Sequence, residues 1–118
     1  MSESKQLARI LKVLAVDTRV RIVQLLKGRA LCVNALAARL GVTQGAVSQH
    51  LRIMRDAGLV IDRKHGYFVH YELNERTLAQ WREAIGGLLD TSCARPENVQ
   101  GAKPCVAMTR KIARNRKT

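Results

Sequence analysis

Apolar residues recur at helical spacing in two segments close to the N-terminus. The first segment, residues 3–15, has an apolar stripe at i, i+3, i+4 and i+7 that consists of Leu7, Ile10, Leu11 and Leu14. The second has a broader apolar face that consists of Val20, Ile22, Val23, Leu25 and Leu26. Both patterns predict helices. Asp17 or Thr18 is expected to cap the second helix. It should run to Lys27, where Gly28 ends it.

Two shorter helical patterns follow, and a tight turn joins them. A short helix is predicted over residues 34–40, where two leucines are spaced i and i+4. Residues 41–43, Gly-Val-Thr, make the turn, and the hydroxyl of Thr43 is suited to cap the next helix. That helix has an apolar stripe of Val47, Leu51 and Met54 and stops at Gly58. Two short helices joined by a glycine-containing turn are typical of a helix-turn-helix motif.

The second helix of this motif has polar side chains away from its apolar stripe. Amide, hydroxyl and guanidinium groups are the ones that hydrogen-bond to base edges and phosphates. The residues of this helix expected to face DNA are Gln44, Ser48, Gln49, His50, Arg52 and Arg55. Ser48 and His50 do not form a catalytic pair, because residues i and i+2 of a helix point about 200° apart.

The period of the pattern changes after residue 59. Apolar and polar residues alternate over residues 67–73, which is typical of a strand, and residues 60–63 supply its partner. Residues 64–66, Lys-His-Gly, would form the turn. A hairpin after a recognition helix is the wing of a winged helix, and a cationic tip suits phosphate or minor-groove contact. An edge hairpin with exposed charges is the alternative. The wing residues expected to contact DNA are Arg63, Lys64 and His65.

A last helical pattern covers residues 75–91. Its apolar stripe consists of Leu78, Trp81, Ile85, Leu88 and Leu89. So small a domain has little core left for this stripe to cover, so we expect it to pack against a second copy of the chain, together with the stripe of the first helix. A dimer also fits a protein that reads a two-fold symmetric DNA site. The predicted fold is therefore mainly α with a β-hairpin wing, a homodimeric winged helix-turn-helix.

Charge and composition add a partner and a compartment to this picture. The 118 residues suffice for one domain, expected over residues 1–91, followed by a basic, partly flexible tail over residues 92–118. A net charge of +12 and a pI near 10.7 favour a polyanionic partner, here double-stranded DNA. No apolar run approaches the ~20 residues of a membrane span, and the start has no secretory pattern. We expect a cytoplasmic protein without membrane contact that is not an enzyme.

Three segments together resemble the ArsR/SmtB family of metal-sensing repressors: Leu31–Val33, Val42–Val60 and Asp62–Tyr71. Ser-Gln-His-Leu-x-x-x-Arg-x-Ala-Gly-Leu-Val followed by Arg-Lys-x-Gly-x-x-x-x-Tyr is specific in combination. The resemblance implies a homodimeric winged helix that represses its operator and releases it when an inducer binds. The arsenic and antimony sensors of the family carry Cys-Val-Cys at the start of the third helix. Here Cys32-Val33-Asn34 keeps the first thiol and lacks the second.

The cysteines suit the inducer that this resemblance implies. Soft metals and metalloids favour thiolates, and three thiols suit a three-coordinate ion such as As(III) or Sb(III) better than tetrahedral zinc. No histidine follows His70, which argues against the zinc and nickel sites that use the last helix. We expect no organic cofactor. The expected ligands of the inducer are Cys32, Cys93 and Cys105.

Other functions stay open at this point. A thiol redox or persulfide sensor of the same fold would need only Cys93 and Cys105, which are close enough in sequence to form a bridge. In that case Cys32 would be a small buried hydrophobic residue. An inducer-free DNA-packaging protein would bind mainly through its basic tail. Sequence-specific binding that does not need the tail would exclude this last function.

Overall fold

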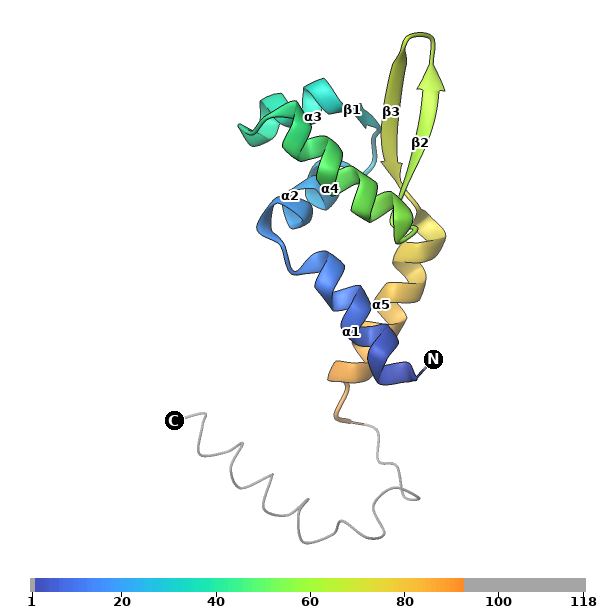
Figure 1. Cartoon of the computed structure of the whole chain (residues 1–118). Helices are drawn as coiled ribbons and strands as arrows, with labels where there is room; N and C mark the ends of the chain where they lie inside the picture. The colour runs from blue at the N-terminus through green and yellow to red at the C-terminus, as the bar shows by residue number, and fades with distance from the viewer. Residues whose placement is uncertain (1, 93–118) are drawn as a thin grey trace, which may run out of the picture. The chain divides into compact units, whose positions relative to one another are not determined.

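The computed structural model describes residues 2–92, and Met1 and residues 93–118 lie outside the described part. The predictions for Cys93, Cys105 and the tail therefore concern residues outside it. Figure 1 shows the elements in chain order: α1 (Glu3–Leu14), α2 (Asp17–Leu25), β1 (Leu31–Cys32), α3 (Val33–Leu40), α4 (Gln44–Asp56), β2 (Val60–His65), β3 (Phe68–Leu73) and α5 (Glu75–Leu89). None of the helices within residues 2–92 is long and apolar enough to cross a membrane.

The helix-turn-helix consists of α3 and α4, as the sequence predicts, and both ends of α4 are closed. The hydroxyl of Thr43 accepts a hydrogen bond from the backbone N–H of Ala46, with 3.1 Å between oxygen and nitrogen. After the other end, Gly58 has a φ of 83°. The N–H groups of Gly58 and Leu59 each donate to a carbonyl of the last turn at 2.9 Å, which makes a Schellman motif.

The bounds of α2 differ from the prediction at both ends. The N-cap residue is Val16, whose side chain makes no capping hydrogen bond, and neither Asp17 nor Thr18 takes that place. Asp17 is the first helical residue, where a carboxylate is favoured by the positive end of the helix dipole. The helix ends at Leu25 rather than Lys27, and a turn follows it.

The three strands form one antiparallel sheet in the order β1-β3-β2 (Figure 1). β2 pairs with β3 along its whole length and forms the wing. β1 pairs with β3 at two positions, Leu31 opposite Tyr71 and Cys32 opposite His70. The sequence does not predict β1, because two residues are too few to show an alternating pattern.

The turn of the wing also differs from the prediction. Lys64 and His65 belong to β2, and the loop consists of Gly66 and Tyr67. Gly66 has a φ of 65°. A type II′ hairpin turn needs a positive φ at its first central position, which glycine adopts without strain. The loop at the tip therefore carries an aromatic side chain, and the cations lie on the strand beside it.

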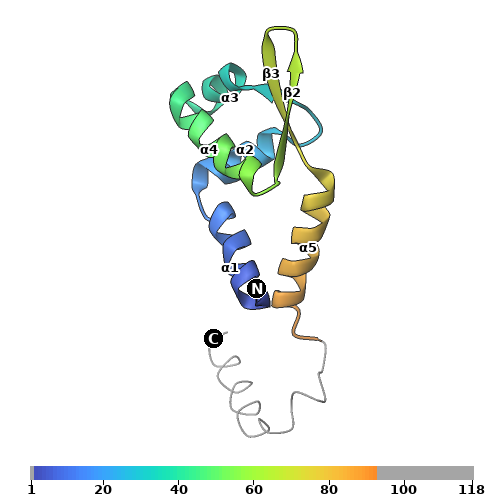
Figure 2. The same cartoon turned by 45° about the vertical axis from the view of Figure 1, so that its right-hand side comes forward.

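The core lies between α2, α3, α4 and the base of the wing. Its largest fully buried side chains are Ile22, Leu26, Leu36, Val47, Leu51, Met54 and Leu59. The predicted apolar stripe of α4 supplies three of them, which confirms that stripe. α1 and α5 contribute one buried side chain each, Val13 and Trp81. Figure 2 shows these two helices extending from the core on the side away from the wing.

Candidate functional site

α4 presents a polar face away from its buried stripe. Val47, Leu51 and Met54 are at most 1% exposed and fix the helix in the core. Five of the six residues expected to face DNA from this helix are exposed: Gln44, Ser48, Gln49, Arg52 and Arg55. Because both ends of α4 are capped, these side chains stand on a rigid element. Such a helix fits the major groove of B-DNA, which is about 12 Å wide.

Ion pairs take up part of the positive charge near this face. Nη1 of Arg55 lies 3.6 Å from Oδ2 of Asp62 on β2. Arg63 is paired with Glu72 across the wing. Both arginines are exposed, so these pairs contribute little to stability and a phosphate can compete with the carboxylates. Among the cations expected to contact DNA, Arg52 and Lys64 have no ion pair within residues 2–92.

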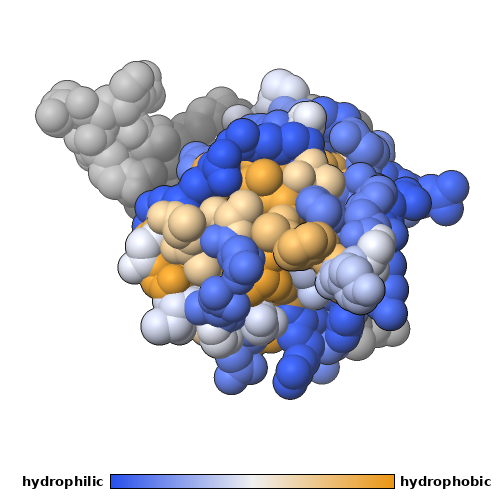
Figure 3. Space-filling view, turned by 90° about the horizontal axis from the view of Figure 1, so that it is seen from above, coloured by the Kyte–Doolittle hydropathy of each residue, from blue (hydrophilic) through white to orange (hydrophobic). Residues whose placement is uncertain are grey.

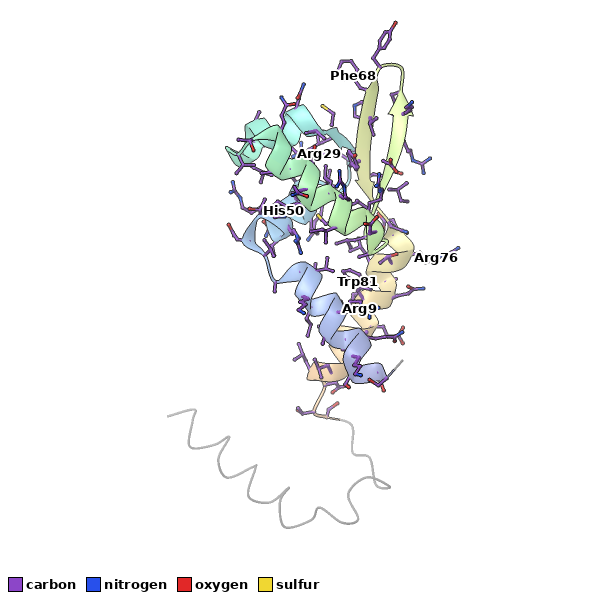
Figure 4. The ribbon with its side chains drawn as sticks, in the orientation of Figure 1. Arg9, Arg29, His50, Phe68, Arg76 and Trp81 are labelled. Atoms are coloured by element: carbon purple, nitrogen blue, oxygen red, sulfur yellow. The ribbon has the colours of Figure 1, made fainter. Side chains whose placement is uncertain are left out.

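The wing tip carries two aromatic side chains that are not among the residues expected from the sequence to contact DNA. Tyr67 is fully exposed and Phe68 is 57% exposed, and Figure 4 shows Phe68 at the end of the hairpin. The alternation over residues 67–73 indicates a strand but does not tell which of its side chains are exposed to solvent. Figure 3 views this end of the molecule and shows hydrophobic residues in the middle with hydrophilic ones around them. Apolar side chains on such projections can contact the minor groove.

His50 lies apart from the other residues expected to face DNA. It is partly buried, and its Nδ1 accepts a hydrogen bond from Nε of Arg19 on α2, at 3.1 Å. Figure 4 shows His50 where α4 passes α2. Burial, and second the charge of Arg19, lower the pKa of His50. About 100° per residue separates His50 from Ser48, and its Nδ1 side lies against α2 instead of in the exposed row of polar side chains.

Cys32 is the last residue of β1 and directly precedes α3. It occupies the N-cap position of α3 without making a side-chain capping bond, and its thiol is free and partly buried. It lines a pocket of about 160 Å³ together with Asn34 and the wing-tip residue Phe68. His70, opposite Cys32 in the sheet, has a buried Nδ1 without a hydrogen-bond partner. The sulfur of Cys32, a soft ligand, is therefore free to bind a metal or metalloid ion at this position.

Of the three predicted ligand cysteines, only Cys32 lies among the described residues. Within residues 2–92, no group of three or more His, Cys, Asp or Glu side chains is arranged to hold a metal ion. A site that uses Cys32 therefore needs donors from elsewhere. Cys93 and Cys105 are such donors by chemistry, and both lie outside the described part.

The predicted dimer face on α1 and α5 is partly exposed and partly covered. Leu11, Leu88 and Leu89 are 38%, 52% and 70% exposed. The partly buried members of the face are Leu7, Ile10, Leu14, Leu78 and Ile85. Trp81 is only 9% exposed, so it packs mainly within its own chain. A hollow of about 440 Å³ remains beside Trp81, and α1, α5 and the end of α4 line it.

The sequence matches known regulatory proteins. Residues 17–62 match the family described as bacterial regulatory protein, arsR family. The chain is 39% identical over 101 residues to the HTH-type transcriptional regulator CmtR of Mycobacterium tuberculosis, which covers 86% of this chain and 80% of CmtR. It is 44% identical over 66 residues to the arsenical resistance operon repressor of Escherichia coli. That match covers 55% of this chain and only 56% of the repressor.

Solved structures share the arrangement of helices and wing. A crystal structure of a possible transcriptional regulator for arsenical resistance is 44% identical, with a TM-score of 0.64 over 68% of this chain and 83% of the other. A homodimeric winged helix-turn-helix DNA-binding domain from Mycobacterium bovis is 26% identical, with a TM-score of 0.59 over 77% of this chain and 89% of the other. The fold is thus a winged helix-turn-helix, as the sequence predicts.

Proposed function

The chain belongs to the ArsR family of bacterial transcriptional regulators, which are not enzymes, and on this basis we propose that it is a repressor controlled by a metalloid. It binds operator DNA as a homodimer. It releases the DNA when As(III) or Sb(III) binds its cysteine thiolates. The observation that carries the DNA-binding part is the exposed polar face of α4, on a helix that is capped at both ends and stands beside a wing.

The exposed side chains of α4 suit two kinds of DNA contact. The amides of Gln44 and Gln49 and the hydroxyl of Ser48 read base edges. Arg52 on α4 and Lys64 on β2 have no ion pair within residues 2–92, so they are free to bind phosphates. Arg55 and Arg63 are paired with Asp62 and Glu72. Because these ion pairs are exposed and weak, a phosphate can displace the carboxylates, and the two arginines then also bind the DNA backbone.

A second copy of the chain covers the apolar parts of α1 and α5. Leu11, Leu88 and Leu89 are large hydrophobic side chains that stand exposed on these two helices. The similar domain from Mycobacterium bovis is homodimeric, which supports this assembly. Two copies also supply the two recognition helices that a two-fold symmetric operator requires.

The inducer site combines Cys32 with Cys93 and Cys105. The thiol of Cys32 makes no capping bond and is not fully buried, so it is free to bind a soft ion. Two similar proteins are named for arsenical resistance, which supports a trivalent metalloid. Binding would favour whichever conformation of the dimer completes the coordination, and a bias of ~1–3 kcal/mol is enough to change operator affinity measurably.

One titration tests the proposal. An operator duplex selected by the protein from random DNA is labelled, and its release is followed by fluorescence anisotropy with As(III), Sb(III), Zn(II), Cd(II), peroxide and persulfide in parallel. We expect release by As(III) and Sb(III). We also expect the Cys93→Ser/Cys105→Ser variant to bind the operator with normal affinity and to stay bound when As(III) or Sb(III) is added. Normal release of this variant by As(III) would overturn the inducer site. Release of the unmodified protein by peroxide or persulfide alone would make it a redox sensor.

A further inference from the structure

Arg19 makes side-chain hydrogen bonds to two other helices from its place on α2. Its Nε donates to Nδ1 of His50 on α4 at 3.1 Å, and its Nη1 donates to the carbonyl oxygen of Val13 on α1 at 3.3 Å. The last four carbonyls of a helix have no partner within it, so Arg19 also satisfies an end of α1. One guanidinium thus joins α1, which carries part of the predicted dimer face, to the helix that reads DNA.

The chemistry of this link requires a neutral imidazole. The N–H groups of arginine only donate, so Nδ1 of His50 must carry a free lone pair and its proton must sit on Nε2. A second proton would turn Nδ1 into a donor. The hydrogen bond would be lost, and two positive charges would face each other.

We propose that Arg19 and His50 are positioning residues that hold α4 against α1 and α2 in the orientation that binds the operator, and that protonation of His50 releases this link. The inference rests on the proposed function, because operator binding is one of its readouts. His50 then acts through the placement of α4, and not as a contact to DNA.

None of the other charged groups around α4 acts on the imidazole of His50 as Arg19 does. The exposed charged residues of the three preceding helices are Glu3, Lys5, Arg9 and Lys12 on α1, Asp17 and Arg21 on α2, and Arg39 on α3. On β2, Asp62 is paired with Arg55. On α4 itself, Arg52 points about 200° away from His50. Arg19 is therefore the charge that acts on His50.

The sign of the pH dependence follows from this environment. Burial, and second Arg19, lower the pKa of His50 in the folded protein. The link is therefore fully present above the ordinary histidine pKa of about 6.5 and is lost as the pH falls through the lowered value. A histidine that contacts phosphates behaves in the opposite way, because DNA favours its protonated form and acid strengthens binding. The two roles of His50 thus predict opposite signs.

Operator affinity at constant ionic strength, from about pH 8 to about pH 5.5, separates these roles. His50→Asn keeps an acceptor oxygen for Arg19 but does not titrate, and the other histidines are the same in both proteins. We expect the unmodified protein to lose affinity at acid pH relative to His50→Asn, by roughly fivefold, the equivalent of one hydrogen bond. At neutral pH, Arg19→Met should weaken binding by a similar factor relative to Arg21→Met, which removes the same charge from an exposed site of α2.

Parallel pH profiles of the unmodified protein and His50→Asn would contradict the proposal, as would equal affinities of Arg19→Met and Arg21→Met. A second readout needs no DNA. In an NMR titration, the pKa of His50 should lie below its ordinary value and should rise in Arg19→Met. An ordinary pKa in the unmodified protein, unchanged by that substitution, would also overturn the link. If the protein binds no operator at all while His50 titrates as expected, the proposed function fails and the link stands.

Discussion

The side chain of Cys32 affects both the stability of α3 and the ligand that can bind there. It holds the N-cap position of α3, where serine, threonine, aspartate or asparagine would normally bind a backbone N–H. Sulfur is a weak acceptor and makes no such bond here, so the start of α3 gives up some stability. In return the thiol is free for a soft ligand. This is the chemistry that a metalloid sensor needs at the entrance to its helix-turn-helix.

Cys32→Ser tests this role. The hydroxyl of serine can cap α3, so the free energy of unfolding should rise by about 0.5–1 kcal/mol in thermal denaturation. Operator binding should stay intact, whereas release by As(III) should need a much higher concentration, because one ligand is lost. Cys32→Ala is the control that removes the thiol without adding a cap. Release of Cys32→Ser at the same As(III) concentration as the unmodified protein would take Cys32 out of the inducer site.

The two cations of the wing should differ in their contribution to DNA binding. Lys64 has no ion pair within residues 2–92, whereas Arg63 must first leave Glu72. Lys64→Ala should therefore weaken binding to all sequences about equally and reduce the slope of affinity against salt by about one. Arg63→Ala, the matched control, should have the smaller effect. An equal or larger loss for Arg63→Ala would show that the ion pair does not hold this arginine back.

At the scale of the elements, the two ends of α4 fix the helix that carries the site. The structure closes its first turn through Thr43 and its last through Gly58, whose φ of 83° is in the left-handed region. A Cβ at Gly58 would meet Oγ1 of Thr77 at 3.5 Å, an ordinary contact, so the cost of a side chain there comes from the backbone. Gly45 lies in the same helix at a helical φ.

Gly58→Ala and Gly45→Ala should therefore change stability in opposite directions. Gly58→Ala forces a side chain into the left-handed region and should lower the free energy of unfolding by about 1–2 kcal/mol. Gly45→Ala lowers the backbone entropy of the unfolded chain at a position that is helical in the folded protein. The free energy of unfolding should therefore rise by roughly 0.5–1 kcal/mol. Chemical denaturation measures both. A Gly58→Ala variant as stable as the unmodified protein would mean that the turn relaxes into another conformation.

The sequence predicts the elements that have a period and misses the contacts that have none. The stripe Val47, Leu51 and Met54 repeats at helical spacing, so both the helix and its buried side follow from the pattern. β1 is too short for a period. Arg19 and His50 are 31 residues apart, and a helix pattern shows only that His50 is off the stripe. Trp81 lies on the apolar stripe of α5, and the helix is confirmed, but periodicity does not tell whether the same chain or a second copy covers the side chain.

At the scale of the whole molecule, the proposed dimer must hold its two recognition helices at a fixed distance. Operators of helix-turn-helix dimers place their half-sites about 34–36 Å apart, or at multiples of this spacing. The exposed leucines of α1 and α5 are the surface on which a second copy would set that distance. Any inducer bound near α3 must then alter the orientation of α4 or the packing of this surface in order to change operator affinity.

Leu88→Asp tests the dimer. Leu88 is 52% exposed in the single chain, so a charge there should leave the fold intact but should not be tolerated in an apolar interface. The molar mass from light scattering should fall from that of a dimer to that of a monomer. Val20→Asp, a control on α2 at a site with 40% exposure, should stay dimeric. An unchanged molar mass for Leu88→Asp would show that Leu88 is not part of the dimer interface.

A comparison of two duplexes tests most directly whether α4 reads the operator. The affinity of Ser48→Ala/Gln49→Ala is measured for the selected operator and for a scrambled duplex of the same length, beside the unmodified protein. Loss of base contacts should cost ~1–3 kcal/mol each on the operator and leave the scrambled duplex nearly unaffected, because phosphate contacts remain. Operator affinity equal to that of the unmodified protein would contradict the assignment of α4 as the recognition helix.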